Sequence, residues 1–224
     1  MRLVGVPAFP TAQGSRWSVS LWGLARGGGQ AGGSPLATPQ LGAGQFGARL
    51  AWRTGDQSPL ALVGRIAAAT GTRQREAAIG IEWRPSRLPL RLVAEQRIAI
   101  EQSRGGAALA IIGGVGDVAL GRGWRLDGYA QGGVIARDGG DGYADGAIRV
   151  SHPVARIGRA TLDIGVGGWG AAQRGAARLD AGPAAGLTVP AAGGALRLAI
   201  EWRQRVAGDA RPGSGPALSA GADF

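Results

Sequence analysis

The chain has 224 residues, including 43 Gly and 12 Pro but no Cys and one His. Its 25 basic residues are all arginine and outnumber 15 acidic residues, for a formal net charge of +10. The lack of cysteine excludes disulfides and thiolate metal sites, and the length suits one large all-β domain or two small ones. Lys and Asn are absent, while Ala, Gly and Arg are abundant, which indicates a GC-rich coding sequence. Because codon composition can itself raise the arginine content, the positive charge alone is weak evidence for a nucleic-acid partner.

Residues 1–14 are predicted to be a leader or linker ahead of the folded part. The apolar stretch 3–9 is too short to be the core of a signal peptide, and Pro10 follows it directly. We therefore expect no signal peptide in the chain as given. The longest uncharged stretch, 27–48, is rich in Gly, Gln, Ser and Pro, so no membrane-spanning helix is predicted.

From residue 15 to residue 224, apolar and polar residues alternate with a period of two, and helical periodicity is almost absent. The predicted strands are 15–25, 40–53, 59–70, 75–84, 89–101, 106–119, 124–136, 142–152, 159–172, 176–189, 195–205 and 216–224. The breaks between them are turn-rich, as in TGDQSP, RPSRLP and ARDGGDG. Because no helix could carry a parallel crossover, we predict an antiparallel meander, and its even strand count allows closure with both ends on one side.

Each predicted strand has one apolar face and one face with charges of both signs, as Ile79 and Ile81 against Glu82 illustrate. A soluble sandwich or small barrel would alternate in the same way, so alternation alone does not identify the solvent outside. The charged face is predicted to line a lumen through Arg49, Arg65, Arg91, Glu95, Arg97, Arg125, Asp127, Asp145, Arg149, Arg197, Glu201 and Arg203. These charges either form a self-satisfied ion-pair ladder or leave an arginine-rich channel that favours anions or acidic sugars. Both interpretations stay open at this stage.

The aromatic residues favour lipid outside the wall, because they gather near strand ends, where a membrane barrel meets the two bilayer interfaces. The predicted interface aromatics are Trp17, Trp52, Trp83, Trp124 and Phe224 at one rim, and Trp22, Phe46 and Trp202 at the other. Parity places Tyr129 and Trp169 on the polar face instead. We therefore predict that residues 15–224 form an all-β fold, a closed antiparallel up-and-down transmembrane β-barrel of about twelve strands in a Gram-negative outer membrane.

The last predicted strand ends the chain on Phe224, after Leu218, Ala220 and Ala222 have alternated with small or polar residues. This ending resembles the C-terminal signal of bacterial outer-membrane barrels, which implies the barrel-insertion machinery and outer-membrane lipid as partners. More narrowly, RVAGDARPGSGPALSAGADF, with looser similarity in RLVAEQRIAI and RLDGYAQGGV, resembles the C-terminal barrel of tetratricopeptide-containing outer-membrane proteins of alphaproteobacteria, the group that includes the bacteriophage adsorption protein A family. The resemblance implies a role in surface polysaccharide export, with an anionic polysaccharide as the ligand, or in phage attachment.

No enzyme motif has the context that its chemistry needs. Residues 165–170 satisfy GxGxxG but lie in a predicted strand with no helix behind them to hold a pyrophosphate. His152 is expected in an exposed turn, too isolated for a catalytic triad or a metal site. We predict no catalytic residue, cofactor or metal. The alternative function is a soluble basic all-β domain that binds a polyanion; nucleic acid ranks low because acids accompany the arginines in nearly every strand.

Overall fold

The protein is described by a computed structural model that covers residues 15–27, 44–70, 73–86, 88–101, 105–137, 139–191 and 193–224, so the predicted leader 1–14 lies outside the described residues. In chain order, the strands are β1 Trp17–Arg26, β2 Gln45–Arg53, β3 Leu60–Ala69, β4 Arg75–Trp83, β5 Leu90–Glu101, β6 Gly106–Gly121, β7 Trp124–Ile135, β8 Asp141–Ile157, β9 Ala160–Gln173, β10 Ala176–Ala191, β11 Gly194–Ala207 and β12 Gly215–Asp223. Within these ranges, no helix is long and apolar enough to cross a membrane.

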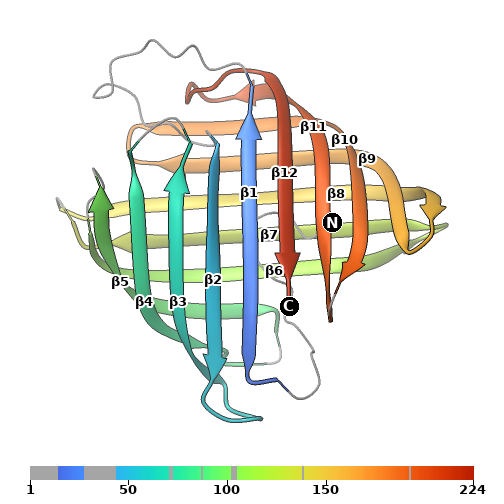
Figure 1. The fold of residues 1–224 in the computed structure, drawn as a ribbon. Helices are drawn as coiled ribbons and strands as arrows, with labels where there is room; N and C mark the ends of the chain where they lie inside the picture. Colours follow the sequence, from blue (N-terminus) through green and yellow to red (C-terminus); the bar gives the residue numbers. More distant parts are fainter. Residues whose placement is uncertain are drawn as a thin grey trace.

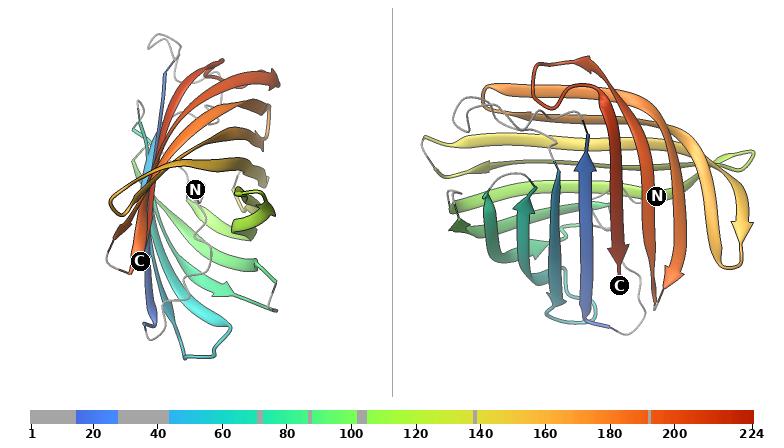
Figure 2. Two further views of the ribbon diagram at one scale, coloured as in Figure 1. Left: turned by 90° about the vertical axis from the view of Figure 1, so that its right-hand side faces the viewer. Right: turned by 45° about the horizontal axis from the view of Figure 1, so that its top comes forward.

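The twelve strands form one closed antiparallel barrel, as predicted. Each strand pairs with its neighbour in the chain, and β1 pairs with β12 to close the sheet. In Figure 1 the strands of the near wall, including β1 and β12, run vertically, whereas β6, β7 and β8 run across them on the far wall; Figure 2 shows the two walls from other sides. Opposite walls cross in this way because closure of a barrel requires the strands to tilt.

The first strand begins and the last strand ends at the same rim of the barrel, which we call the terminal rim. There the Val19 N–H donates to the Phe224 carbonyl oxygen at 3.0 Å, and the Phe224 N–H donates back at 2.9 Å. The opposite rim, where β1 ends and β12 begins, is the distal rim. Closure satisfies the backbone groups of both end strands, so the first and last strands present no open edge.

Burial is inverted relative to a soluble domain. The largest fully buried side chains are those of Arg149, Glu82, Glu201, Asp180 and Ser219. Large apolar side chains lie exposed on the outer wall, among them Ile79 at 65% and Ile200 at 67%. A soluble fold places such apolar residues inside and keeps most of its charged side chains in water. The period of two in the sequence therefore sends charge inward and hydrocarbon outward.

The predicted interface aromatics lie near the two rims, with one correction. Trp17, Phe46, Trp83, Trp124 and Trp202 are exposed, while Trp52 and Phe224 are half-buried. The rings of Trp17 and Trp52 contact each other at the terminal rim, with centroids 6.2 Å apart. Trp22, however, lines the lumen. It lies five positions after the outward-facing Trp17, and an odd interval in a strand reverses the face.

Strand β8 runs five residues beyond its predicted end at residue 152, which corrects the expected position of His152. This residue lies within the strand, and its ring packs edge-on against that of Trp124, with centroids 5.3 Å apart. The following Pro153 sits where the pairing of β8 with β9 shifts. A bulge tolerates proline because it leaves no ladder hydrogen bond for the missing N–H to make.

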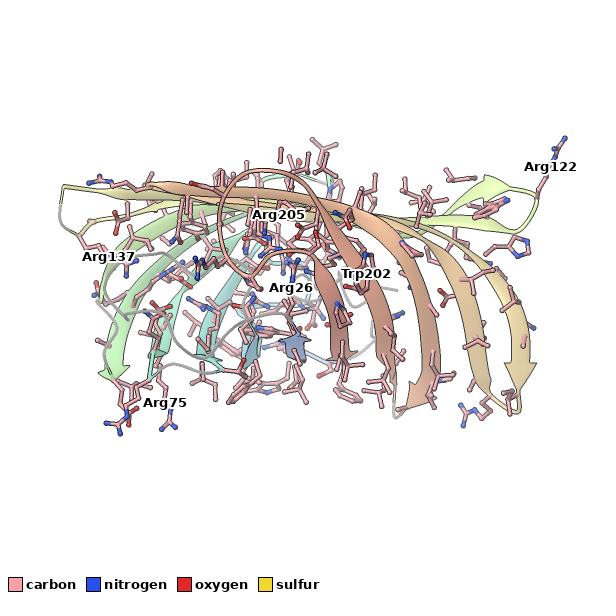
Figure 3. All side chains as sticks on the ribbon, turned by 90° about the horizontal axis from the view of Figure 1, so that it is seen from above. Arg26, Arg75, Arg122, Arg137, Trp202 and Arg205 are labelled. Carbon is pink, nitrogen blue, oxygen red and sulfur yellow. The ribbon has the colours of Figure 1, made fainter. Side chains whose placement is uncertain are left out.

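Figure 3 shows the tip of the β6–β7 hairpin, marked by Arg122, reaching outward.

Candidate functional site in the barrel lumen

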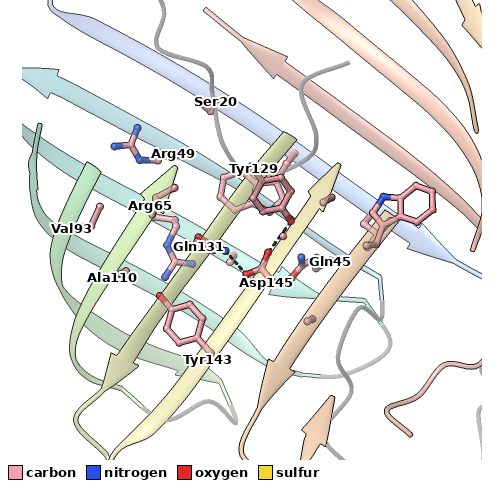
Figure 4. A pocket seen from close by; sticks show the side chains of 18 of the residues that line it. Ser20, Gln45, Arg49, Arg65, Val93, Ala110, Tyr129, Gln131, Tyr143 and Asp145 are labelled. Atoms are coloured by element: carbon pink, nitrogen blue, oxygen red, sulfur yellow. Dashed lines mark hydrogen bonds between the residues drawn. The ribbon is translucent and has the colours of Figure 1, made fainter. Parts of the chain in front are cut away.

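The lumen contains a cavity of about 390 Å³, lined by side chains from both walls (Figure 4). The predicted lumen residues that line it are Arg49, Arg65, Arg91, Glu95, Arg97, Asp145, Glu201 and Arg203. Asp127 and Arg149 lie buried on the inner wall outside this cavity, and Arg197 is half-buried. The alternation rule thus brings side chains from strands far apart in sequence to one interior space.

Arg125, another predicted lumen residue, does not line the cavity. Its side chain is 47% exposed and pairs with Asp117, whose carboxylate lies 2.5 Å away on the same β6–β7 hairpin. Asp117 has φ of 60° and lies where the pairing of β6 with β7 shifts. Strand β7 keeps its regular pairing with β8 here, with Arg125 opposite Ser151 and Asp127 opposite Arg149. Arg125 is exposed because it is the second residue of β7, close to the terminal rim.

The first ionic cluster surrounds Glu82 on β4, whose side chain is fully buried. The carboxylate accepts hydrogen bonds from Arg49 on β2, from Arg84 at 2.9 Å and from Arg91 on β5 at 3.3 Å. One negative charge thus faces three guanidinium groups. The cluster links β2, β4 and β5 and brings Arg49 and Arg91 to the cavity wall.

A second, balanced ladder lies beside it. Arg65 donates to Glu76 at 2.8 Å and to Glu95 at 2.9 Å. Arg97 donates to Glu95 at 2.8 Å and to the Tyr143 hydroxyl at 2.9 Å, with its guanidinium 5.1 Å from the tyrosine ring centroid. Because Arg97 is on β5 and Tyr143 on β8, this contact spans the lumen face of β6 and β7 and narrows the interior there.

Near the distal rim, Asp180 on β10 is fully buried and again faces three arginines. It accepts from Arg26 at 2.9 Å, from Arg178 through Nε at 2.9 Å and from Arg205 at 2.9 Å. Arg26 and Asp180 are 154 residues apart in the chain, and closure of the barrel brings them together. The Glu82 and Asp180 clusters therefore hold six guanidinium groups against two carboxylates.

The Asp180 cluster also holds the loop between β11 and β12, residues 208–214, over the distal rim (Figure 3). Arg205 donates to the carbonyl oxygens of Gly208 at 3.0 Å and Pro212 at 2.6 Å, and Arg26 donates to that of Gly213 at 2.9 Å. Ala210 at the centre of the loop is buried, and its N–H donates to the Ala177 carbonyl oxygen at 3.1 Å. We call residues 208–214 the distal loop.

We expect Asp180→Asn to free the distal loop, because the two arginines that hold it lose their shared counter-charge. The chain contains no cysteine, so Ala210→Cys provides a single thiol that is buried in the native arrangement. Maleimide should label this thiol about tenfold faster or more in the Asp180→Asn background, since each tenfold corresponds to about 1.4 kcal/mol of easier opening. The matched control is Asp209→Cys, an exposed neighbour, which should react equally fast in both backgrounds. Unchanged labelling of Ala210→Cys would show that the loop is held by packing alone.

Asp145 on β8 differs from the other carboxylates of the cavity. It accepts from the Tyr129 hydroxyl at 2.8 Å and from Gln131 Nε2 at 2.6 Å, as the dashed lines in Figure 4 mark. Across the described part of the chain, no arginine lies within ion-pair distance of it. The β7–β8 wall therefore presents hydroxyl, amide and carboxylate groups, whereas β2, β3 and β5 present guanidinium groups.

Two tryptophans face the lumen, and each lies over a glycine. The Trp169 ring would collide with any Cβ at Gly167, and the Trp22 ring with one at Gly47. The GxGxxG pattern at 165–170 is thus part of β9, where Gly167 makes room for an inward-facing ring. Arg203 stacks over Trp169 at 4.5 Å from its centroid. Among the residues that the structure describes, no three acidic or histidine side chains gather into a metal site.

No family model and no curated protein matches this sequence. Among solved structures, the chain is similar to one described as a bacterial polysaccharide outer membrane secretin, with a TM-score of 0.51 and 10% identity over 93% of this chain and 97% of that one. It is also similar to the NanC porin (TM-score 0.43, 9% identity, 92% and 98% covered) and to the β-domain of the Bordetella autotransporter BrkA (0.39, 14%, 93% and 97%). The first likeness shows a shared barrel fold. The narrower resemblance to tetratricopeptide-containing proteins stays a prediction.

Proposed function

We propose that this chain is an integral outer-membrane β-barrel whose lumen passes anionic solutes, without a catalytic step of its own. The observation that carries the proposal is the inverted burial of a closed wall, with Arg149 and Glu82 fully buried and Ile79 and Ile200 exposed. Hydrocarbon is the only biological solvent that such an outer surface favours, and a closed barrel is the β-structure that satisfies its backbone in lipid.

The rims support this location. Trp17, Trp83 and Trp124 are exposed near the terminal rim, and Phe46 and Trp202 near the distal rim, where amphipathic rings would meet the headgroups. We propose that the terminal rim faces the periplasm. Strand β12, which carries the exposed Leu218 and closes on β1, would be the segment that the barrel-insertion machinery engages.

The charge distribution supports a preference for anions. The Glu82 and Asp180 clusters each place three guanidinium groups around one carboxylate, and rings of arginine favour anions in pores. The same burial disfavours the soluble polyanion-binding alternative, because a basic surface for nucleic acid would present its arginines to bulk water. Here Arg91, Arg149 and Arg178 are buried inside the barrel.

The narrower role that we favour is translocation of an acidic polysaccharide, with phage attachment at the distal rim as the second candidate. Both come from the resemblance of the last hairpin to tetratricopeptide-containing outer-membrane proteins. Export is supported by the cavity itself, which combines arginines with aromatic and amide groups, such as Tyr129 and Gln131. Attachment would require the loops of the distal rim rather than the lumen.

Planar-bilayer recordings under a chloride gradient test the proposal. We expect the refolded barrel to give a reversal potential on the anion-selective side, and Arg49→Gln to move it toward zero. Arg49 suits this test because it lines the cavity, and Glu82 keeps Arg84 and Arg91 as partners after the change. The control is Arg125→Gln, whose side chain lies on the exposed hairpin outside the cavity. Cation selectivity in the native protein, or equal shifts in both variants, would contradict the proposal.

A further inference from the structure

The cavity is chemically two-sided. Arg49 on β2 and Arg65 on β3 bring guanidinium groups to one side, and Tyr129, Gln131 and Asp145 bring a hydroxyl, an amide and a carboxylate to the other (Figure 4). A pore that sorted solutes by charge alone would need only the first side. The second side is built from groups that recognise hydroxyls, which indicates a ligand with more than a negative charge.

Asp145 is the decisive residue on the second side. In a lumen with excess arginine, a carboxylate that served only to balance charge would lie against a guanidinium, as Glu82 and Asp180 do. Asp145 instead accepts one hydrogen bond from Tyr129 and one from Gln131. A carboxylate has about four acceptor positions, so about two remain for hydroxyl donors from the cavity. A simple anion donates nothing and is repelled by this group.

The two donors of Asp145 also fix its orientation. Tyr129 packs against the buried pair Ala147 and Trp169, which holds the phenol ring in place behind its hydroxyl. Gln131 pairs directly with Asp145 in the β7–β8 register. Trp22 adds apolar ring surface to the same cavity, suited to the C–H face of a sugar. The carboxylate is thus held ready for a ligand rather than free to swing toward the arginines.

We propose that this cavity binds a sugar acid, with the ligand carboxylate on Arg49, one of the three arginines that share Glu82, and the ligand hydroxyls on Asp145. Asp145 is then the residue that separates sugar acids from other anions. A volume of about 390 Å³ falls in the range of small-molecule sites, roughly 300–1,000 Å³. The inference rests on the proposed function only in placing this cavity on the permeation path; binding itself does not require conduction.

Titration calorimetry on the detergent-refolded barrel tests the inference with two trivalent probes, trigalacturonate and tricarballylate. Both carry three carboxylates, but only the first carries sugar hydroxyls. We expect the native barrel to bind trigalacturonate about tenfold more tightly or more, since hydrogen bonds to a charged group are among the stronger ones. Asp145→Asn, which keeps the shape but not the charge, should erase this difference by weakening trigalacturonate and leaving tricarballylate equal or tighter. Asp117→Asn on the exposed hairpin should leave both affinities unchanged.

The outcomes separate this inference from the proposed function. Equal affinity for the two probes in the native barrel would overturn the sugar-acid site, even where bilayer recordings show anion selectivity. Discrimination that survives in Asp145→Asn would overturn the role of Asp145. If the barrel inserts into the bilayer without conducting ions but gives the expected calorimetric pattern, the proposed pore is wrong and the binding site is supported. Block of the chloride current by trigalacturonate at lower concentration than by tricarballylate would support both.

Discussion

Replacing Glu82 with Gln is expected to lower the free energy of unfolding of the lipid-reconstituted barrel by about 3–5 kcal/mol, the usual loss when one partner of a buried ionic cluster is removed. The change leaves Arg49, Arg84 and Arg91 around a neutral amide inside the wall. Their mutual repulsion is then uncompensated, and water cannot reach the fully buried position to screen it. Urea unfolding followed by tryptophan fluorescence measures the loss.

The control for this variant is Asp56→Asn. Asp56 pairs with Arg16 at 3.0 Å, but its side chain is 81% exposed, so removal of its charge should cost no more than about 1 kcal/mol. Similar small losses in both variants would mean that water enters the lumen as far as Glu82 and screens the cluster. The difference between the two variants therefore reports how dry this part of the wall is.

An arginine on the outer wall is the second change with a large expected effect. Ile79 lies in the middle of β4, halfway between Arg75 at one end and Trp83 at the other, and its side chain is exposed. In a bilayer, Ile79→Arg should cost about 2–4 kcal/mol, because the charge must enter the hydrocarbon near the midplane. Unfolding in lipid vesicles, followed by the shift of the folded band on unheated gels, provides the measurement.

The matched variant is Leu60→Arg, which puts the same side chain on the outer wall at the terminal rim, where Leu60 pairs with Trp83. At this height, the charge reaches the headgroups, and the expected cost falls to about 0–1 kcal/mol. Stability that is unchanged in Ile79→Arg, together with better solubility in plain buffer, would place water rather than lipid outside the wall. That result would favour a soluble polyanion-binding domain over a membrane barrel.

Much of the architecture was predictable because it depends on local patterns. Alternation in a strand requires no knowledge of distant residues, so the twelve strands, the charged interior and the aromatic rims follow from counting along the chain. The same counting places Trp169 inside, and Trp22 as well, because it lies an odd number of positions after the outward-facing Trp17. Counting does not show where a strand ends, as at His152 and Pro153, or how far an inward position lies from the cavity, as at Arg125.

The sequence by itself determined which face each residue takes, since side-chain direction in a strand alternates by covalent geometry. Only the tertiary structure decided which charges meet, because partners on a barrel wall depend on register, tilt and closure. Arg26 reaches Asp180 only because β1 closes on β12, and Arg97 reaches Tyr143 only because the wall curves between β5 and β8. Asp145 looks like any other inward acid in the sequence. Its separation from the arginines, on which the proposed sugar-acid site depends, exists only in three dimensions.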